Sequence, residues 1–342
     1  MRVSVIVPTY RRPESLARCL DALDRQTRAA QETIVVVRGD DAASRQVVRS
    51  RAARPVRLVL VHRPGVVAAM NAGLDASDGE VVALTDDDAA PHADWLERIV
   101  DTYARDRDRR IAAVGGRDWV TSYKTGRLIE QSETVVGRID WLGRVTGNHH
   151  AGVGQARDVD VLKGVNLSVR GELLRRIRFD ERLRGVGTEH HWELALCLAL
   201  RRGGYRIVYD PAIAVDHHPQ PRVDDSRMFN SSELRDARHN ETLAVLEHLP
   251  AWRGVFHLGW ACTIGTGSAP GIVQLARSPP PRGCARWQRF AGAQAGLADG
   301  LRTYRRTRHV GDGRPMLANV GSGNVGDAVG QAEPEPDVHS IG

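Results

Sequence analysis

Three consecutive carboxylates follow a short apolar run in the N-terminal half of the chain. Val81-Val82-Ala83-Leu84 leads through Thr85 into Asp86, Asp87 and Asp88. An unbroken apolar run of this length is typical of a strand buried on both faces in a parallel sheet. Unpaired charges are costly to bury, so these acids must lie at the carboxyl end of the strand, where open α/β sheets bind ligands. Asp86 and Asp88 could there hold a Mg²⁺ or Mn²⁺ ion carrying phosphate oxygens.

A simpler explanation covers only one of the three acids. Asp88 could cap a helix that begins near residues 92–96. Capping accounts for one carboxylate and leaves the other two unexplained, so we favour the metal and phosphate site.

The surrounding pattern indicates which elements position these acids. Strands are expected at 3–7, 33–37, 56–61, 81–84, 111–114 and 205–209, and helices at 14–26, 43–53, 66–74, 92–103, 172–177 and 194–202. Alternating strands and helices favour a parallel sheet with right-handed crossovers. Thr9, Tyr10, Asp40 and Asp41 follow the first two strands, so their loops share one rim with Asp86 to Asp88. The pattern of residues 115–160 indicates only long loops or a short hairpin.

Composition excludes several other classes. The 342 residues are 42% hydrophobic and 26% charged, as in ordinary soluble proteins, and the net charge of +6 is mostly arginine. Aromatic residues make up only 5% and no nucleic-acid motif is present, so we expect no nucleic-acid partner. Neither GxGxxG nor GxxxxGK[ST] occurs after the first strand. The chain is therefore not expected to be a dinucleotide-binding domain or a P-loop NTPase.

The compartment is expected to be the cytoplasm. The four cysteines, at positions 19, 197, 262 and 284, are scattered without metal-ligand spacing, which suits reduced thiols. The chain enters a strand at once, which leaves no room for a signal peptide, and no apolar run reaches the roughly 18 residues of a membrane-spanning helix.

The order of motifs resembles glycosyltransferase family 2, whose members have the GT-A fold. The matching pieces lie in residues 1–220, namely Val5-Ile6-Val7-Pro8-Thr9-Tyr10, Asn71-Ala72-Gly73-Leu74, Leu84-Thr85-Asp86-Asp87-Asp88, Gly164-Val165-Asn166-Leu167, Phe179-Asp180-Glu181, Glu193, Gly204-Tyr205, Asp210-Pro211 and His217-His218. Each piece is weak alone, but the series is specific. It implies a Rossmann-like, mostly parallel sheet flanked by helices.

The resemblance also implies an activity, namely inverting transfer of a sugar from a nucleotide-diphosphosugar donor, assisted by Mg²⁺ or Mn²⁺. Asp86 and Asp88 match the Asp-x-Asp pair that meets ribose and metal-bound diphosphate. The acid that contacts the base could be Asp40 or Asp41. The residues implied to bind the nucleotide sugar are Pro8, Thr9, Tyr10, Asp40, Asp41, Asn71, Asp86 and Asp87; those implied to bind the metal are Asp86, Asp88, His217 and His218. The family often has arginine where this chain has Met70.

The catalytic base implied by the family is a carboxylate at the start of the helix before Gly204-Tyr205. Counting back along that helix gives Glu193, and counting forward from the glycine loop gives Glu189 instead. The helix constrains the register more tightly, so we prefer Glu193. A carboxylate of this kind would take the proton of an acceptor hydroxyl. Asn166, Lys163, His191 and Trp192 are expected on the acceptor side.

The remaining third is expected to be an appendage of the catalytic domain. We expect a GT-A domain at 1–220, a C-terminal helical extension at 221–310 and a disordered tail at 311–342, which is rich in glycine, Asp and Glu-Pro. Residues 233–249 and 286–302 are helical in pattern, and 302–308 is strongly basic. The extension could be a cap packed on the catalytic domain, or could contact the inner face of a membrane.

Two function classes follow from this pattern. The first is a transferase of polysaccharide or glycoconjugate biosynthesis, acting on a glycan, lipid-linked or small-molecule acceptor. The alternative is a non-catalytic sugar- or partner-binding protein that retains the GT-A fold, suggested by Trp192 and Met70. A nucleotidyltransferase is disfavoured because the chain lacks a glycine- and arginine-rich nucleotide loop.

Overall fold

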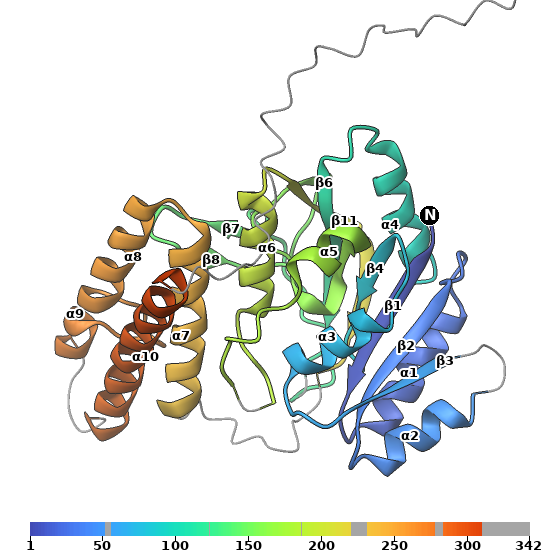
Figure 1. The fold of residues 1–342 in the computed structure, drawn as a ribbon, viewed down its shortest axis with the longest axis horizontal. Helices are drawn as coiled ribbons and strands as arrows, with labels where there is room; N and C mark the ends of the chain where they lie inside the picture. The colour runs from blue at the N-terminus through green and yellow to red at the C-terminus, as the bar shows by residue number, and fades with distance from the viewer. Residues whose placement is uncertain (52–55, 123, 186, 220–230, 278–282, 310–342) are drawn as a thin grey trace, which may run out of the picture.

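One mixed β-sheet organises residues 3–217. The computed structural model describes residues 1–51, 56–122, 124–185, 187–219, 231–277 and 283–309. Within them the sheet has nine strands, in the order β3-β2-β1-β4-β10-β6-β11-β5, with β9 paired to β11 (Figure 1). The strands are β1 Val3–Thr9, β2 Glu32–Arg38, β3 Val56–Val61, β4 Val81–Leu84, β5 Ala89–Pro91, β6 Ile111–Val120, β9 Arg157–Asp158, β10 Leu167–Arg170 and β11 Arg206–His217.

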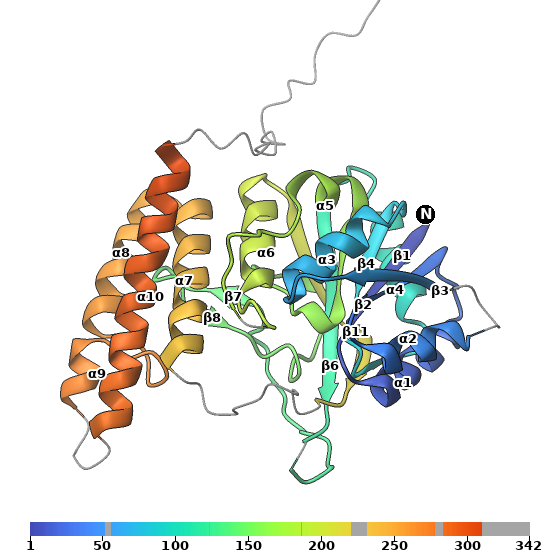
Figure 2. The same ribbon diagram turned by 60° about the horizontal axis from the view of Figure 1, so that its bottom comes forward.

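Helices cover both faces of this sheet because its strands are apolar on both sides. In β1, Val5 and Val7 face one core and Ile6 faces the other, as the two-residue period of a strand requires. The first core is closed by α1 Pro13–Asp24, α2 Ala42–Arg49 and α4 Trp95–Arg105, and the second by α3 Val66–Asp75, α5 Gly171–Ile177 and α6 Trp192–Arg202 (Figure 2). The predicted α/β arrangement of helices around a buried sheet is therefore present.

The first four strands of the sheet are parallel, and β10 is not. β10 lies between β4 and β6 and runs antiparallel to both, with Leu167 opposite Leu84 and Gly115. The sequence pattern predicts no strand direction for this segment. A short 3-10 turn, Gly164–Asn166, directly precedes β10 and faces the end of β4.

Two strands are longer than the sequence pattern predicted. β6 continues through Gly115 and Gly116 to Val120. These glycines allow a close backbone approach, because a Cβ at Gly116 would lie 1.9 Å from the carbonyl oxygen of Ile213. The strand predicted at 205–209 does not end there: β11 passes through Asp210-Pro211 with a register shift, a position where a sheet tolerates proline.

The described C-terminal segments form a group of helices on the far side of α6 from the sheet, as both ribbon views show. They are α7 Ser231–His248, α8 Ala251–Thr263, α9 Ile272–Ala276 and α10 Gly283–His309. α7 packs against both α6 and α10. Among the residues described, no helix is both long and apolar enough to cross a membrane. The predicted tail at 311–342 lies outside the described residues.

The helix predicted at 233–249 is present as α7, but two of its basic residues lie in the interior. Arg238 and His239 are buried rather than solvated. His239 lies 2.9 Å from the hydroxyl oxygen of Thr303 on α10, and Arg238 is paired with Glu241. Both sides of α7 are covered, because α6 and α10 pack on opposite flanks of it.

Candidate active site

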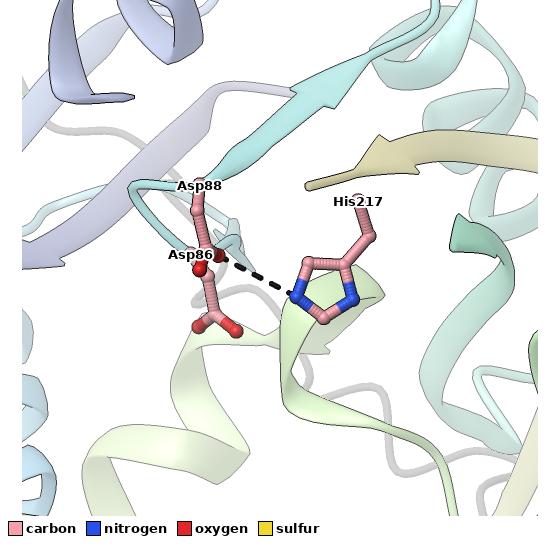
Figure 3. A group of neighbouring side chains, drawn as sticks. All are labelled: Asp86, Asp88 and His217. Carbon is pink, nitrogen blue, oxygen red and sulfur yellow. Dashed lines mark ion pairs between the residues drawn. The ribbon is translucent and has the colours of Figure 1, made fainter. Parts of the chain in front are cut away.

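Asp86, Asp88 and His217 come together at the end of β4. Each offers one ligand atom, and these atoms lie within 4.8 Å of one another (Figure 3). The two acids belong to the loop between β4 and β5, and His217 is the last residue of β11. The antiparallel pairing of β5 with β11 sets Ala89 opposite His217, and the backbone N–H of His218 donates to the carbonyl of Asp88 at 2.9 Å. His217 is 129 positions from Asp88 in the sequence (217 minus 88), yet the two residues share one site.

Mutual repulsion and burial leave this cluster suited to a cation. Burial, followed by the charge of Asp88, raises the pKa of Asp86 to about 6, against the opposing effect of His217. Nε2 of His217 lies 3.5 Å from Oδ1 of Asp88. Two carboxylates and an imidazole nitrogen form a donor set that suits a divalent ion such as Mn²⁺ or Mg²⁺. The residues present therefore fit the metal that the sequence implies.

Asp118 lies beside Nδ1 of His217, and the sequence did not predict this contact. It is fully buried on β6, with one carboxylate oxygen 3.4 Å from Nδ1 of His217, and it also pairs with Lys163. Burial acts to raise the pKa of Asp118, but its bonds to His217 and Lys163 outweigh burial and lower it. Burial likewise acts to lower the pKa of His217, and its bonds to Asp118 and Asp88 raise it to about 9.

Asp87 connects the acidic loop to the end of β1. It accepts a hydrogen bond from the hydroxyl of Thr9 at 2.7 Å and one from Arg12 at 3.1 Å. Arg12 also donates to Asp88 at 3.0 Å. Burial is the main reason that the pKa of Asp87 rises to about 7. Thr9 and Asp87, both predicted to contact the nucleotide sugar, thus bond to each other, and Arg12 was not predicted.

The two candidate bases have different surroundings. Glu193 lies at the start of α6, and its carboxylate accepts from the backbone N–H of Gly164 at 3.4 Å. Burial raises its pKa, and its charge in turn raises the pKa of Asp86. Glu189 instead accepts from the N–H groups of Val66 and Val67 at 2.7 and 3.3 Å, which caps the N-terminus of α3.

Asp40 and Asp41 have distinct positions after β2. Asp41 is buried and caps α2, accepting from the N–H of Ser44 at 3.1 Å. Asp40 is exposed at the rim, where Arg38 donates to it at 3.1 Å and the hydroxyl of Tyr10 at 3.2 Å. Only Asp40 of the pair is therefore accessible to a ligand.

Two predicted asparagines hold the scaffold together. Asn71 exchanges hydrogen bonds with the backbone of Phe179, at 3.0 and 3.1 Å. Asn166 accepts from the indole N–H of Trp95 at 2.9 Å and donates to the carbonyls of Arg117 and Ile213. Both side chains are buried, and their polar atoms are satisfied by protein.

The remaining predicted residues include Trp192, His191 and Pro8. Trp192 is buried and packs edge-on against Phe179, with ring centroids 5.4 Å apart, and His191 has a left-handed backbone (φ 68°) where α6 begins. Pro8 is half-buried in β1. A cavity of about 170 Å³ lies between α1 and β5, lined by Ser15, Arg18, Asp21, Arg25, Asp88, Ala89, Ala90 and His218.

Residues 4–151, which include β1, the acidic loop and β6, match the model described as Glycosyl transferase family 2. This part of the chain is similar to that family. Glycosyltransferase AglE of Haloferax volcanii is 34% identical over 137 residues, which cover 39% of this chain and 44% of AglE. Glucosyl-dolichyl phosphate glucuronosyltransferase of the same organism is 28% identical over 231 residues, or 64% of this chain and 69% of that enzyme. The chain thus spans less than half the length of AglE.

A solved structure confirms the predicted GT-A fold class. The structure of GalNAc-T7 with UDP, GalNAc and Mn²⁺ superimposes with a TM-score of 0.61 at 13% identity, covering 92% of this chain and 58% of that one. Identity this low supports the fold and does not transfer a substrate.

Proposed function

We propose that the chain is a metal-assisted, inverting glycosyltransferase that moves a sugar from a nucleotide-diphosphosugar to an acceptor hydroxyl. The observation that carries this proposal is the cluster of Asp86, Asp88 and His217 beside Glu193. The match of residues 4–151 to the family model supports the transferase class, and AglE and the glucuronosyltransferase are named as enzymes of that class. The solved GalNAc-T7 structure holds a nucleotide, a sugar and Mn²⁺ together.

Each residue of the cluster has a role in the proposed reaction. A cation held by Asp88 and His217, with Asp86 close by, would neutralise charge that develops on the leaving diphosphate. Asp118 orients His217 toward this position. Glu193 accepts the proton of the acceptor hydroxyl as it attacks. Burial raises the pKa of Glu193, which makes its carboxylate a stronger base than an exposed one.

We assign the contact to the nucleotide base from the solvent exposure of Asp40 and Asp41. Asp40 is the acid after β2 that lies open at the rim, so we assign it, rather than Asp41, to the base of the nucleotide. Thr9 and Asp87 position the loop beneath the diphosphate through their mutual hydrogen bond. The acceptor class and a cytoplasmic location at the inner face of a membrane stay predictions.

The non-catalytic alternative rested on Trp192 and Met70. Both side chains are buried in the core beneath α3 and α6 and offer no binding surface. Their unusual identities are therefore explained by packing.

Incubation with radiolabelled nucleotide sugars and Mn²⁺ tests the proposal. We expect transfer or slow donor hydrolysis by the wild type and loss of it in Asp88→Ala. Glu193→Gln should bind donor normally but lower turnover by about 10²- to 10⁴-fold, the usual effect of removing a general base. Donor binding without turnover, unchanged in Glu193→Gln, would support the non-catalytic alternative instead.

A further inference from the structure

The outer face of α8 is apolar and exposed. Trp252, Val255 and Phe256 are 55%, 69% and 51% exposed, and their spacing puts them on one side of the helix. The other exposed positions of α8 are Ala251, Gly259 and Thr263, so this side carries no charge. Large exposed apolar surfaces mark sites of interaction.

An aromatic side chain from outside α8 completes this surface. Trp141, which lies between β7 Arg138–Ile139 and β8 Val145–Thr146, is 56% exposed. Its ring meets Phe256 edge-on with centroids 5.5 Å apart, and Trp252 meets Phe256 at 6.2 Å. We call Trp141, Trp252, Val255 and Phe256 the aromatic face.

The aromatic face is held in place by buried polar contacts beneath it. Nδ1 of His257, a fully buried residue of α8, lies 2.9 Å from the carbonyl oxygen of Leu142. Arg253 donates to the carbonyl of Asp140, and Arg144 lies over the ring of Trp260 at 5.6 Å. The segment that carries Trp141 is therefore fixed to α8, and the three rings form a preformed surface.

The net positive charge of residues 251–309 favours an anionic partner. Residues 251–309 contain nine arginines, no lysine and one acid, Asp299, so the segment has a net charge of +8 (nine minus one) while the whole chain has +6. Exposed arginines of this segment include Arg277, Arg289, Arg305 and Arg306. An anionic surface is complementary to this charge, whereas a second copy of the chain would bring two such segments together.

We propose that the aromatic face docks on an anionic lipid bilayer, with Trp141, Trp252, Val255 and Phe256 entering the interface and exposed arginines of residues 251–309 meeting lipid phosphates. Tryptophan and phenylalanine partition into the membrane interface, and each basic residue near an anionic leaflet adds to the affinity. The C-terminal helices α8 and α9 lie at the edge of the molecule remote from β3 (Figures 1 and 2). This inference goes beyond the proposed transfer reaction and does not depend on the donor.

Cosedimentation of the full chain with phosphatidylcholine vesicles, with and without phosphatidylglycerol, tests the docking. We expect binding to the anionic vesicles that weakens as salt rises, because salt screens the arginines. The double variant Trp252→Ser with Phe256→Ser should lose about tenfold or more of this binding. Leu60→Ser is the matched control, since Leu60 is 44% exposed on β3, away from the aromatic face.

Circular dichroism of each variant verifies that it is folded; should the double variant unfold, Trp252→Ser alone should lower binding in the same direction. No binding to anionic vesicles, or equal loss in Leu60→Ser, would overturn the proposal. Analytical ultracentrifugation supplies a further check: a dimer that the double variant abolishes would assign the face to a second copy. Because no donor is present, these results are separate from any failure of the transferase proposal.

Discussion

At the scale of single residues, the proposed metal site depends on a carboxylate that is not among its candidate ligands. Asp118 is fully buried, and it holds His217 from the side opposite Asp88. An acid behind a ligating histidine fixes the orientation of the ring and raises its basicity. Lys163 compensates the charge of Asp118.

We therefore expect Asp118→Asn to weaken Mn²⁺ binding by about 10- to 100-fold, the range typical of such supporting residues. Isothermal titration with Mn²⁺ measures this. Asp158→Asn is the control, because Asp158 pairs with Arg206 on an exposed edge of the sheet. Equal Mn²⁺ affinity in both variants would contradict a role for Asp118 in orienting His217.

The raised pKa of Glu193 leads to a separate prediction about how activity depends on pH. Burial raises the pKa of Glu193 above its usual 4.5, and only its ionised form can accept a proton. Activity should thus fall, as pH is lowered, at a higher pH than an ordinary carboxyl would give. The dependence of kcat/KM on pH measures this midpoint, and Glu189→Gln should keep it. A midpoint at or below 4.5 would exclude Glu193 as the base.

The sequence pointed to the candidate ligands better than to the residues that support them. Asp86 and Asp88 follow β4 and His217 ends β11, so the rim of the sheet brings the three together. Asp118 was missed because its strand continues past a glycine pair that a local pattern interprets as a break. The buried bonds of Asn71 and Asn166 join segments at least 47 residues apart, and local spacing contains no sign of them.

At the scale of elements, α3 begins on a carboxylate from a distant loop. Glu189 bonds two N–H groups at the helix start, and Gly65, with φ of 116°, leaves room for it; a Cβ at Gly65 would lie 2.0 Å from a carboxylate oxygen. The charge also meets the positive end of the helix dipole. Glu189 therefore stabilises the start of α3, and we propose that this is its role.

Glu189→Ala should lower the free energy of unfolding by about 1–2 kcal/mol, the range found for lost helix caps. Urea unfolding measures this change. Glu181→Ala, which removes an exposed pair with Arg63, should cost at most about 1 kcal/mol. Activity per folded molecule should survive in Glu189→Ala. If activity is lost without a change in stability, Glu189 rather than Glu193 is the base.

The elements differ in how far local sequence specifies them. Strands β1 to β4 and helices α1, α3 and α4 were predicted to within a few residues, because each strand is a short, largely apolar run bounded by polar residues and each helix lies between two such runs. The direction of β10 was not predictable, since Leu167 pairs with residues of β4 and β6 that lie 83 and 52 positions away in sequence (167 minus 84, and 167 minus 115). Non-local pairing decides such strands.

At the scale of the whole molecule, one buried acid joins the C-terminal helices to the loop before α6. Asp299 of α10 accepts from Arg184 at 3.1 Å and from Arg235 of α7 at 2.7 Å, and it also pairs with Arg302. Burial acts to raise its pKa, but these arginines outweigh burial and lower it. A cap packed on the catalytic domain was one of two alternatives that the sequence left open, and this acid is one point where the C-terminal helices are attached.

We expect Asp299→Asn to destabilise the protein, because three guanidinium groups would then surround a neutral side chain. Breaking a fully buried pair costs about 3–5 kcal/mol, but these arginines are 44–61% exposed, so we expect about 1–2 kcal/mol. Since α7 packs directly on α6, the C-terminal helices and the sheet should still unfold in one calorimetric transition at a lower temperature. Asp101→Asn, on the exposed side of α4, should leave that temperature within error. Two separate transitions in Asp299→Asn would mean that the C-terminal helices fold independently of the sheet.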